Sequence, residues 1–374
     1  MKLFDYERAH AIMKKNQLDA IVVNSRVHRE YIADYSHFFP ILEHTQLTWY
    51  STGNPTIPGY VAFACIPRDQ KIGPFLIHRE GNEKMMAKAA DIWISDIRYW
   101  KGDPVKTLAE TLEDKGLAQA QIGFELDSIS HWLYKRIEYS LPGVIIRNAE
   151  GTLAEMRQIK TEEEIRRLKK AAHAAEAANE EVWSKLKEGL TYNEVKKIIH
   201  TSLAANEADC NMVGLSFSPQ LATSPQPLLA QGNSIRTDIG AEYKGYLSDI
   251  SRVKFFGEPS NISLYVYKTI QEAFEITLEN VKAGVKVTDL LAPGTKIASK
   301  VGGWTFLHGI GRVMMEPRLT DVLMKGEVVC VEAETVHPEA GVVCIEDEVV
   351  VTEDGFELLT TQSSALEIIE PTKY

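Results

Sequence analysis

The chain has few cysteines and lacks the features that mark several classes of protein. Its 374 residues include four cysteines, and no two of them have C-x-x-C spacing, so neither a zinc knuckle nor a disulfide scaffold is indicated. No apolar run approaches the ~20 residues needed to cross a bilayer, so we expect no membrane segment. The net charge of −11 disfavours a partner with a phosphate backbone, so we expect no nucleic-acid partner.

The first residues also lack the apolar core of a signal peptide. The stretch "MKLFDYERAHAIMKK" carries acidic residues instead, and we therefore expect a cytoplasmic protein. Apolar residues make up 44% of the chain and charged residues 25%, which is typical of folded globular proteins. The length is sufficient for two domains, each with its own core.

Residues 1–152 predict an α/β domain, because helical and strand patterns alternate along them. "DYERAHAIMKKNQL" has helical periodicity, "DAIVVN" is typical of a short buried strand, and "GYVAFACIP" with "IGPFLIH" predicts a hairpin. Residues 36–58 fit neither period and are rich in aromatic and turn-forming residues. We expect a long loop there that helps to select the substrate, with His37, His44, Trp49 and Tyr50 available to line a pocket.

Residues 153–374 predict a second domain with a repeated order of elements. "TEEEIRRLKKAAHAAEAANEEVWSKLK" predicts a long amphipathic helix that begins with a capping box formed by Thr161 and Glu164. A second helix and a hairpin follow, and then two more helices and two strands. This order, helix, helix, hairpin and again helix, helix, hairpin, indicates a weak duplication in architecture.

Each hairpin of the second domain carries two acidic residues. If 238–242 pairs with 245–249 around a turn at Tyr243–Lys244, Asp238 and Asp249 lie directly opposite each other, with β-carbons ~5 Å apart. In the later hairpin, a turn near "HPEAG" places Glu332 opposite Glu346. Four carboxylates directed at one interior require a cation, so we expect a metal site, and more specifically two ions.

One histidine is well placed to complete such a site. His308 lies in "GWTFLHGIGRVMMEP", between an apolar run and two glycines, where a tight turn can fix its side chain. Oxygen ligands alone favour Mn or Mg, whereas one added imidazole extends the range to Fe, Co and Zn.

These motifs resemble a known family. "TDIGAEYKGYLSDISR", "FLHGIGR", "KGEVVCVEAE" and "GVVCIEDEVVVTEDG", in this order, are similar to those of the pita-bread metallopeptidases, which include prolidase, aminopeptidase P, methionine aminopeptidase and the related creatinase. "EMRQIKTEEEIRRLKKAA" resembles the linker and first helix of the prolidase and creatinase branch. The resemblance covers roughly residues 150–360 and implies a creatinase/prolidase-like α/β N-terminal domain followed by an α+β pita-bread catalytic domain.

The resemblance also implies roles for individual residues. Asp238 would bind one metal ion, Asp249 and Glu346 would bridge both, and His308 and Glu332 would bind the other. The ions would be Mn first, with Co, Zn or Fe as alternatives. The resemblance further implies a homodimer, in which the N-terminal domain of one chain closes over its partner's site. In such a site the ions activate a water, and Glu332 is the expected proton acceptor.

The sequence departs from the family's pattern at two histidines that handle the substrate. Met315 stands where a second histidine is expected after His308, and Gln220 and Leu221 stand where one is expected before Asp238. Loss of one such donor would cost roughly 10²–10³ in rate on a peptide, so an altered substrate is indicated.

Other polar side chains are candidates for the missing roles. Beside Glu332, Arg252 and Arg312 are our candidate catalytic residues, and Arg318 and Tyr246 are further candidates to replace the histidines. Arg252 is also a candidate for a salt bridge that supports a ligand carboxylate. Glu334 and Glu348 flank the expected ligands and are alternative ligands, but Glu332 and Glu346 match the motif. Cys330 and Cys344 precede Glu332 and Glu346 by two positions, where they are candidates to tune the site, although small core residues are the expected interpretation.

Together these features predict a dinuclear metal-dependent hydrolase of a C–N bond in a small molecule. An Xaa-Pro dipeptide is the substrate that the resemblance implies, whereas Met315 favours a non-peptide amide or a related metabolite. Two other hypotheses remain: a lyase that uses the same metals for elimination, and a non-catalytic peptidase-like binding module. The complete ligand set argues against the binding module.

Overall fold

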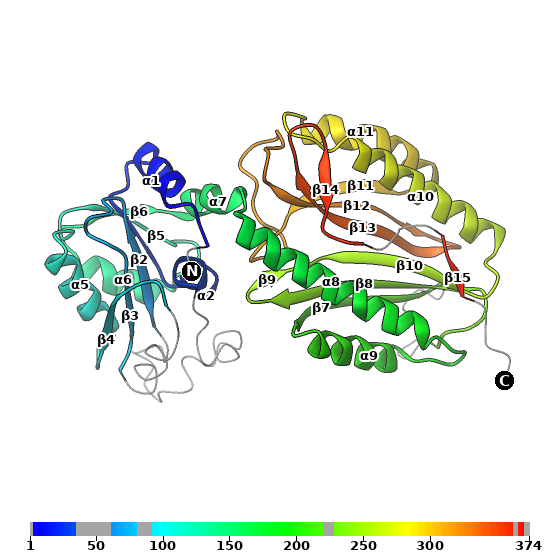
Figure 1. The fold of residues 1–374 in the computed structure, drawn as a ribbon, viewed down its shortest axis with the longest axis horizontal. Helices are drawn as coiled ribbons and strands as arrows, with labels where there is room; N and C mark the ends of the chain where they lie inside the picture. The colour runs from blue at the N-terminus through cyan, green and yellow to red at the C-terminus, as the bar shows by residue number, and fades with distance from the viewer. Residues whose placement is uncertain (1–2, 35–60, 81–91, 220–227, 362–365, 370–374) are drawn as a thin grey trace. The chain divides into compact units, whose positions relative to one another are not determined.

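In the computed structural model of the chain, the described residues are 3–34, 61–80, 92–219, 228–361 and 366–369. They form two compact units, Met1–Arg157 and Gln158–Tyr374 (Figure 1). The expected loop at 36–58 and the positions of Gln220 and Leu221 lie outside the described residues. None of the described helices is both long and apolar enough to cross a bilayer.

The described part of the N-terminal unit is a mixed six-stranded sheet with helices, in the strand order β4-β3-β2-β1-β5-β6. Strand β1 has only apolar side chains, and all four are buried at the centre of this sheet. The predicted hairpin is confirmed as β2 and β3, which pair antiparallel. The elements are β1 (Ala20–Val23), β2 (Phe63–Pro67), β3 (Phe75–Arg79), β4 (Asp96–Trp100), β5 (Gln121–Phe124), β6 (Ile145–Asn148), α1 (Tyr6–Lys15), α2 (Arg26–Ala33), α5 (Pro104–Asp114), α6 (His131–Ser140) and α7 (Glu150–Gln158).

The described part of the C-terminal unit is built on a nine-stranded sheet whose main path runs β11-β12-β13-β10-β8-β7. The order of two helices and a hairpin, followed by two helices and a hairpin, is present, and the structure adds one strand before each hairpin, β7 and β11. The elements are α8 (Glu162–Ser184), α9 (Tyr192–Ala205), β7 (Asp209–Ser218), β8 (Asn233–Tyr243), β9 (Tyr246–Leu247), β10 (Ile250–Phe256), α10 (Asn261–Glu279), α11 (Val287–Ala298), the 3₁₀ turn η1 (Ser299–Val301), β11 (Trp304–Gly309), β12 (Val328–His337), β13 (Gly341–Val351), β14 (Phe356–Leu358) and β15 (Ile368–Ile369).

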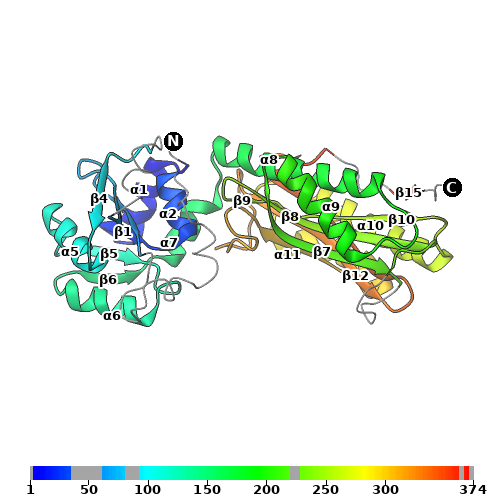
Figure 2. The same cartoon turned by 90° about the horizontal axis from the view of Figure 1, so that it is seen from below.

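The four described helices of this unit cover one face of its sheet. Figures 1 and 2 show α8 and α9 beside β7 and β8, and α10 and α11 beside β11, β12 and β13, as the contacts between elements require. The hydroxyl of Thr237 on β8 donates to Asn179 of α8 (2.6 Å), and Val331 on β12 packs into the core with residues of α10 and α11. Asp238 follows Thr237 and Glu332 follows Val331, and neighbouring strand residues point to opposite faces. Asp238 and Glu332 therefore point to the face without these helices.

The hairpin at β8–β10 has a register that differs from the prediction. Asp238 pairs with Ser251, not with Asp249, because the turn lies at Lys244–Gly245. Both turn residues have positive φ (50° and 77°), which is the conformation of the tight turns that match strand twist, and glycine adopts it readily. The two aspartates are therefore diagonal neighbours instead of a directly opposed pair.

The register of the second hairpin is confirmed. Glu332 on β12 pairs directly with Glu346 on β13, and the pairing continues to His337 and Gly341 beside the turn. The predicted capping box at the start of α8 is also present, since the side chain of Thr161 accepts from Glu164 N–H and the side chain of Glu164 accepts from Thr161 N–H. The hairpin register follows from strand alternation and the capping box from residue types three positions apart, so both depend only on residues close in the sequence.

Candidate metal centre

Asp238, Asp249 and Glu346 approach one another on the helix-free face. Each offers a carboxylate oxygen that lies within 4.8 Å of those of the other two. Asp238 points from β8, Asp249 immediately precedes β10, and Glu346 lies on β13, which pairs with β10 at Ser251. The diagonal register of the first hairpin therefore still brings the three carboxylates together.

His308 joins this group from the edge of the sheet. Its Nε2 lies 3.2 Å from Glu346 Oε1 and 3.8 Å from Asp249 Oδ2. Its other ring nitrogen, Nδ1, lies 3.1 Å from the carbonyl oxygen of Gly309. When Nδ1–H donates to this carbonyl, Nε2 is left as the nitrogen that faces the carboxylates, which is the usual arrangement for a metal-binding histidine.

Glu332 completes the predicted set and brings two thiols with it. Cys344 Sγ donates to Glu332 Oε1 (3.2 Å), and the ligand atoms of Glu332, Cys344 and Glu346 lie within 4.8 Å of one another. The ligand atoms of Cys330, His308 and Glu346 also lie within 4.8 Å of one another. The structure thus brings all five predicted ligands into one cluster and places the two cysteines beside them, fully buried.

Burial of so many carboxylates raises their pKa values. Burial, together with the charges of Glu346 and Asp238, raises the pKa of Asp249 to about 9. Burial and the charge of Glu334 raise the pKa of Glu332 to about 6, and burial with the charge of Glu332 raises the pKa of Glu346 well above its ordinary value. In the absence of a cation, the simultaneous ionisation of these carboxyl groups is therefore unfavourable.

The cluster fits a hard cation. Among the described residues, Asp238 Oδ1, Asp249 Oδ1 and Glu348 Oε2 are buried oxygens without a hydrogen-bond partner. Glu348 is fully buried and accepts from Asp249 N–H through its other oxygen, so it adds a further carboxylate that supports Asp249. Unpartnered carboxylate oxygens beside one imidazole are the donors that Mn, Fe, Co and Zn bind in proteins.

Arg236 is a residue of this site that the sequence reasoning missed. Its Nη2 donates to Asp238 Oδ2, and its Nε donates to Ser251 Oγ (3.1 Å). It precedes Asp238 by two positions on the same strand, and strand alternation alone places both side chains on one face. That spacing was the signal available in the sequence.

The two arginines predicted as catalytic residues contact groups other than the predicted ligand side chains. Arg252 is buried on the helix-covered side, where its Nη2 donates to Asp347 Oδ1 (2.6 Å) and its Nη1 to the carbonyl of Glu346 (2.6 Å). The predicted salt bridge that supports a ligand strand is therefore present, whereas Arg252 faces away from the ligand carboxylates. The guanidinium of Arg312 lies over the ring of Tyr246, 5.1 Å from its centroid.

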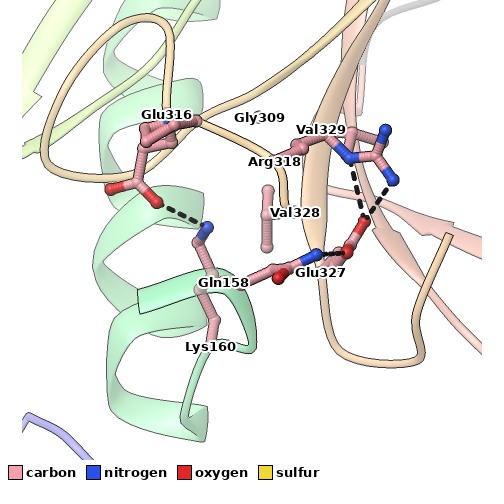
Figure 3. Close-up of a pocket in the computed structure, with 9 residues that line it drawn as sticks. Gln158, Lys160, Gly309, Glu316, Arg318, Glu327, Val328 and Val329 are labelled. Carbon is pink, nitrogen blue, oxygen red and sulfur yellow. Dashed lines mark hydrogen bonds and ion pairs between the residues drawn. The ribbon is translucent and has the colours of Figure 1, made fainter. Parts of the chain in front are cut away.

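The loop after His308 is held by a buried ion pair. Lys160 Nζ donates to Glu316 Oε2 (2.9 Å), and Glu316 Oε1 accepts from Arg312 N–H (2.9 Å). Figure 3 shows Lys160 and Glu316 in a small pocket that Gly309 also lines, next to His308 in the chain. This pair fixes the end of the loop that carries Met315, whose side chain is 57% exposed.

The remaining candidates for the missing donors are also engaged. The guanidinium of Arg318 donates to Glu327 Oε2 in the same pocket (Figure 3). Tyr246 is fully buried and donates to Glu164 Oε1 (3.1 Å).

The fold and the cluster together define a two-domain protein of the pita-bread type, with an acidic site on the open face of its C-terminal sheet. The model of metallopeptidase family M24 matches residues 166–353, and that of the creatinase/prolidase N-terminal domain matches residues 6–159. The chain belongs to metallopeptidase family M24. The predicted fold class and the predicted enzyme class, a metal-dependent hydrolase, are both confirmed at this level.

Individual relatives agree with this membership. The putative dipeptidase YkvY of Bacillus subtilis is 27% identical over 332 residues, covering 81% of this chain and 90% of the relative. The uncharacterized peptidase YqhT of Bacillus subtilis is 28% identical over 284 residues, covering 72% and 80%. Among solved structures, an Xaa-Pro dipeptidase from Bacillus anthracis matches with a TM-score of 0.80 at 24% identity, covering 97% of this chain and 98% of that one. The X-Pro aminopeptidase from Thermotoga maritima matches with a TM-score of 0.79 at 22% identity, covering 98% and 99%.

Proposed function

We propose that this protein hydrolyses a C–N bond, amide or peptide, in a small substrate, and that an Xaa-Pro dipeptide is the first substrate to test. The observation that carries the proposal is the cluster on the helix-free face, formed by Asp238, Asp249, His308, Glu332 and Glu346. The names of YkvY and of the Bacillus anthracis structure support a dipeptide.

The proposed centre would hold two divalent ions, with Mn the first choice and Co, Zn or Fe the alternatives. Asp238 would hold one ion, His308 and Glu332 would hold the other, and Asp249 and Glu346 would contribute to both. When bound, such ions polarise the scissile carbonyl and lower the pKa of water. Four carboxylates and one imidazole as donors support this range of metals.

The chain's own residues have separate tasks in this scheme. Glu332 takes the proton of the attacking water, because it is partly exposed on the open face while the neighbouring Glu346 is buried. Arg236 holds one oxygen of Asp238 and leaves the other directed into the cluster. The bond between His308 Nδ1 and Gly309 keeps the imidazole in one orientation.

The test is product detection by mass spectrometry after Mn-loaded protein is incubated with a panel of Xaa-Pro dipeptides. We expect cleavage by the wild type and loss of turnover in Glu332→Ala and Glu332→Gln, with metal content measured on the same samples. Glu339→Gln changes an exposed glutamate in the turn of the same hairpin and serves as the matched control. Full activity in the Glu332 variants contradicts the proposed role of Glu332. No cleavage of any dipeptide by the metal-loaded wild type contradicts a peptide substrate and moves the search to non-peptide amides.

A lyase on the same site is the second candidate, and Met315 favours it. An exposed methionine cannot donate to an oxyanion, whereas a histidine at this position can. Elimination releases an unsaturated product without incorporation of oxygen from water. Mass spectrometry in H₂¹⁸O therefore separates the two candidates, since hydrolysis leaves one ¹⁸O atom in the acid product.

We also propose that the protein is a cytoplasmic homodimer without a membrane or nucleic-acid partner. The family resemblance supports the dimer, and the net charge of −11 supports the absence of a nucleic-acid partner. Light scattering on a sizing column measures the mass directly. A mass equal to one chain of 41.9 kDa contradicts the dimer.

A further inference from the structure

An aromatic surface continues from the proposed metal centre along strand β11. Trp304 and Phe306 precede His308 by four and two positions, so all three side chains point to the same face of the sheet. Trp304 is 42% exposed and Phe306 is 39% exposed. The ring centroid of Phe306 lies 5.7 Å from that of His308. The aromatic surface is therefore open to solvent and continuous with a proposed ligand.

A row of carboxylates lies opposite these rings on the neighbouring strand. In the antiparallel register of β11 and β12, Trp304 pairs with Glu334 and Phe306 with Glu332. Such directly opposed side chains have β-carbons ~5 Å apart. Glu332 is committed to the proposed centre, whereas Glu334 is partly exposed and makes no hydrogen bond or ion pair with any described residue. The far end of the aromatic surface therefore carries an unneutralised negative charge.

This combination is suited to a cation with an apolar stem. Aromatic faces attract ammonium and guanidinium groups, and a carboxylate beside them adds Coulomb attraction. Phe306 lies ~7 Å from His308 along the strand and Trp304 lies ~13 Å away. A flexible four-carbon stem of the lysine type can follow the ring of Phe306 and place its charge near Trp304 and Glu334.

We infer that Trp304, Phe306 and Glu334 form a specificity subsite for a long, cationic side chain next to the scissile bond, so that the preferred substrates are lysine- or arginine-type Xaa-Pro dipeptides. This inference rests on the proposed hydrolase function and names its substrate class. The stem packs on the aromatic rings, and the charged end lies between Trp304 and Glu334.

The experiment compares kcat/KM for Lys-Pro, norleucine-Pro, Glu-Pro and Ala-Pro with the Mn-loaded protein. Norleucine has the lysine stem without its charge, so the ratio of Lys-Pro to norleucine-Pro isolates the cation. We expect a ratio of about 10 or more, and a ratio near 1 in Glu334→Gln, which keeps the shape of the side chain. We expect Phe306→Leu and Trp304→Leu to lower the preference for norleucine-Pro over Ala-Pro. Glu339→Gln is the control, and its ratios should equal those of the wild type.

Each outcome decides one question. Cleavage of several dipeptides with Lys-Pro no better than norleucine-Pro overturns the subsite but leaves the hydrolase. Cleavage of none overturns the peptide substrate. In that case calorimetric binding of Lys-Pro and norleucine-Pro still tests the subsite without turnover: equal affinities overturn it, and tighter Lys-Pro binding that is lost in Glu334→Gln supports it.

Discussion

Glu164 makes the stability of the C-terminal unit depend on pH in a direction opposite to that of most carboxylates. It is 1% exposed and occupies the third position of α8, where its Oε2 accepts from Thr161 N–H (2.8 Å) and its Oε1 from Tyr246 OH (3.1 Å). Burial raises the pKa of Glu164 to about 7, and the Thr161 N–H and the charge of Lys160 counteract only part of this rise. The carboxyl group is therefore protonated in the folded state at pH values where the unfolded chain has released the proton.

The sign and size of the effect follow from this difference. Between the unfolded value of 4.5 and the folded value of about 7, the folded state binds more protons, so the free energy of unfolding falls as pH rises through this window. At about 1.36 kcal/mol for each pKa unit, the full loss is about 3 kcal/mol. Between pH 5 and pH 8.5 it is about 2.5 kcal/mol.

Glu164→Gln removes this dependence, because glutamine is neutral at every pH and is accepted at the third position of a capping box. We expect the free energy of unfolding of the variant, relative to the wild type, to rise by about 2–3 kcal/mol from pH 5 to pH 8.5, measured by urea unfolding of the intact chain. The matched control is Glu194→Gln in the capping box of α9, where Glu194 is exposed and Thr191 lowers its pKa. That variant should show no such rise. Parallel pH curves for Glu164→Gln and the wild type would refute the reasoning.

Three further predictions concern the proposed metal centre and the residues that support its strands. Chelation should lower the melting temperature of the wild type in scanning fluorimetry. Mn at 100-fold excess over Kd should raise the free energy of unfolding again by about 2.7 kcal/mol for each site. A melting temperature that responds to neither treatment contradicts a metal centre. Arg252→Met should lower the free energy of unfolding, measured by chemical denaturation, by about 3–5 kcal/mol, because Asp347 is left charged and buried. The double variant Arg252→Met with Asp347→Leu should recover most of this loss. Gly245→Ala should lower the free energy of unfolding by more than about 1 kcal/mol and weaken Mn binding in calorimetry. The reason is that Gly245 has φ +77° and that an added β-carbon meets Arg312 Nη2 at 2.5 Å. Wild-type stability in this variant would mean that the turn does not set the register.

The two hairpins show what the sequence could and could not predict. The pairing of Glu332 with Glu346 follows from two uninterrupted apolar strands and one short turn, so period-two alternation was sufficient. In the first hairpin the same rule gave a register two residues off, because the position of the turn depends on which residues accept positive φ. A strand pattern does not carry that information, whereas Gly245 does.

The sheet face on which Arg252 and Arg236 lie is predictable from their spacing to the neighbouring aspartates. Arg252 follows Asp249 by three positions, and an odd spacing on a continuous strand places side chains on opposite faces, where the structure has them. Arg236 precedes Asp238 by an even spacing and lies on the same face. By contrast, the engagement of Arg312 with Tyr246 joins a loop to a hairpin, and no local rule predicts it.

The proposed ligands and Met315 lie on parts of the fold that are constrained in different ways. The ligand side chains come from strands whose positions are fixed by hydrogen-bonded pairing, or from residues directly joined to them. Met315 lies on a loop, and its side chain is largely exposed. The next residue, Glu316, holds the loop by accepting from Lys160 Nζ and from Arg312 N–H. Replacing an exposed side chain on such a loop removes few contacts, whereas replacing a proposed ligand alters a buried cluster of carboxylates. In this architecture a substitution at position 315 therefore costs less stability than a substitution at a proposed ligand, and the aromatic residues of β11 lie on the same strand as the proposed ligand His308.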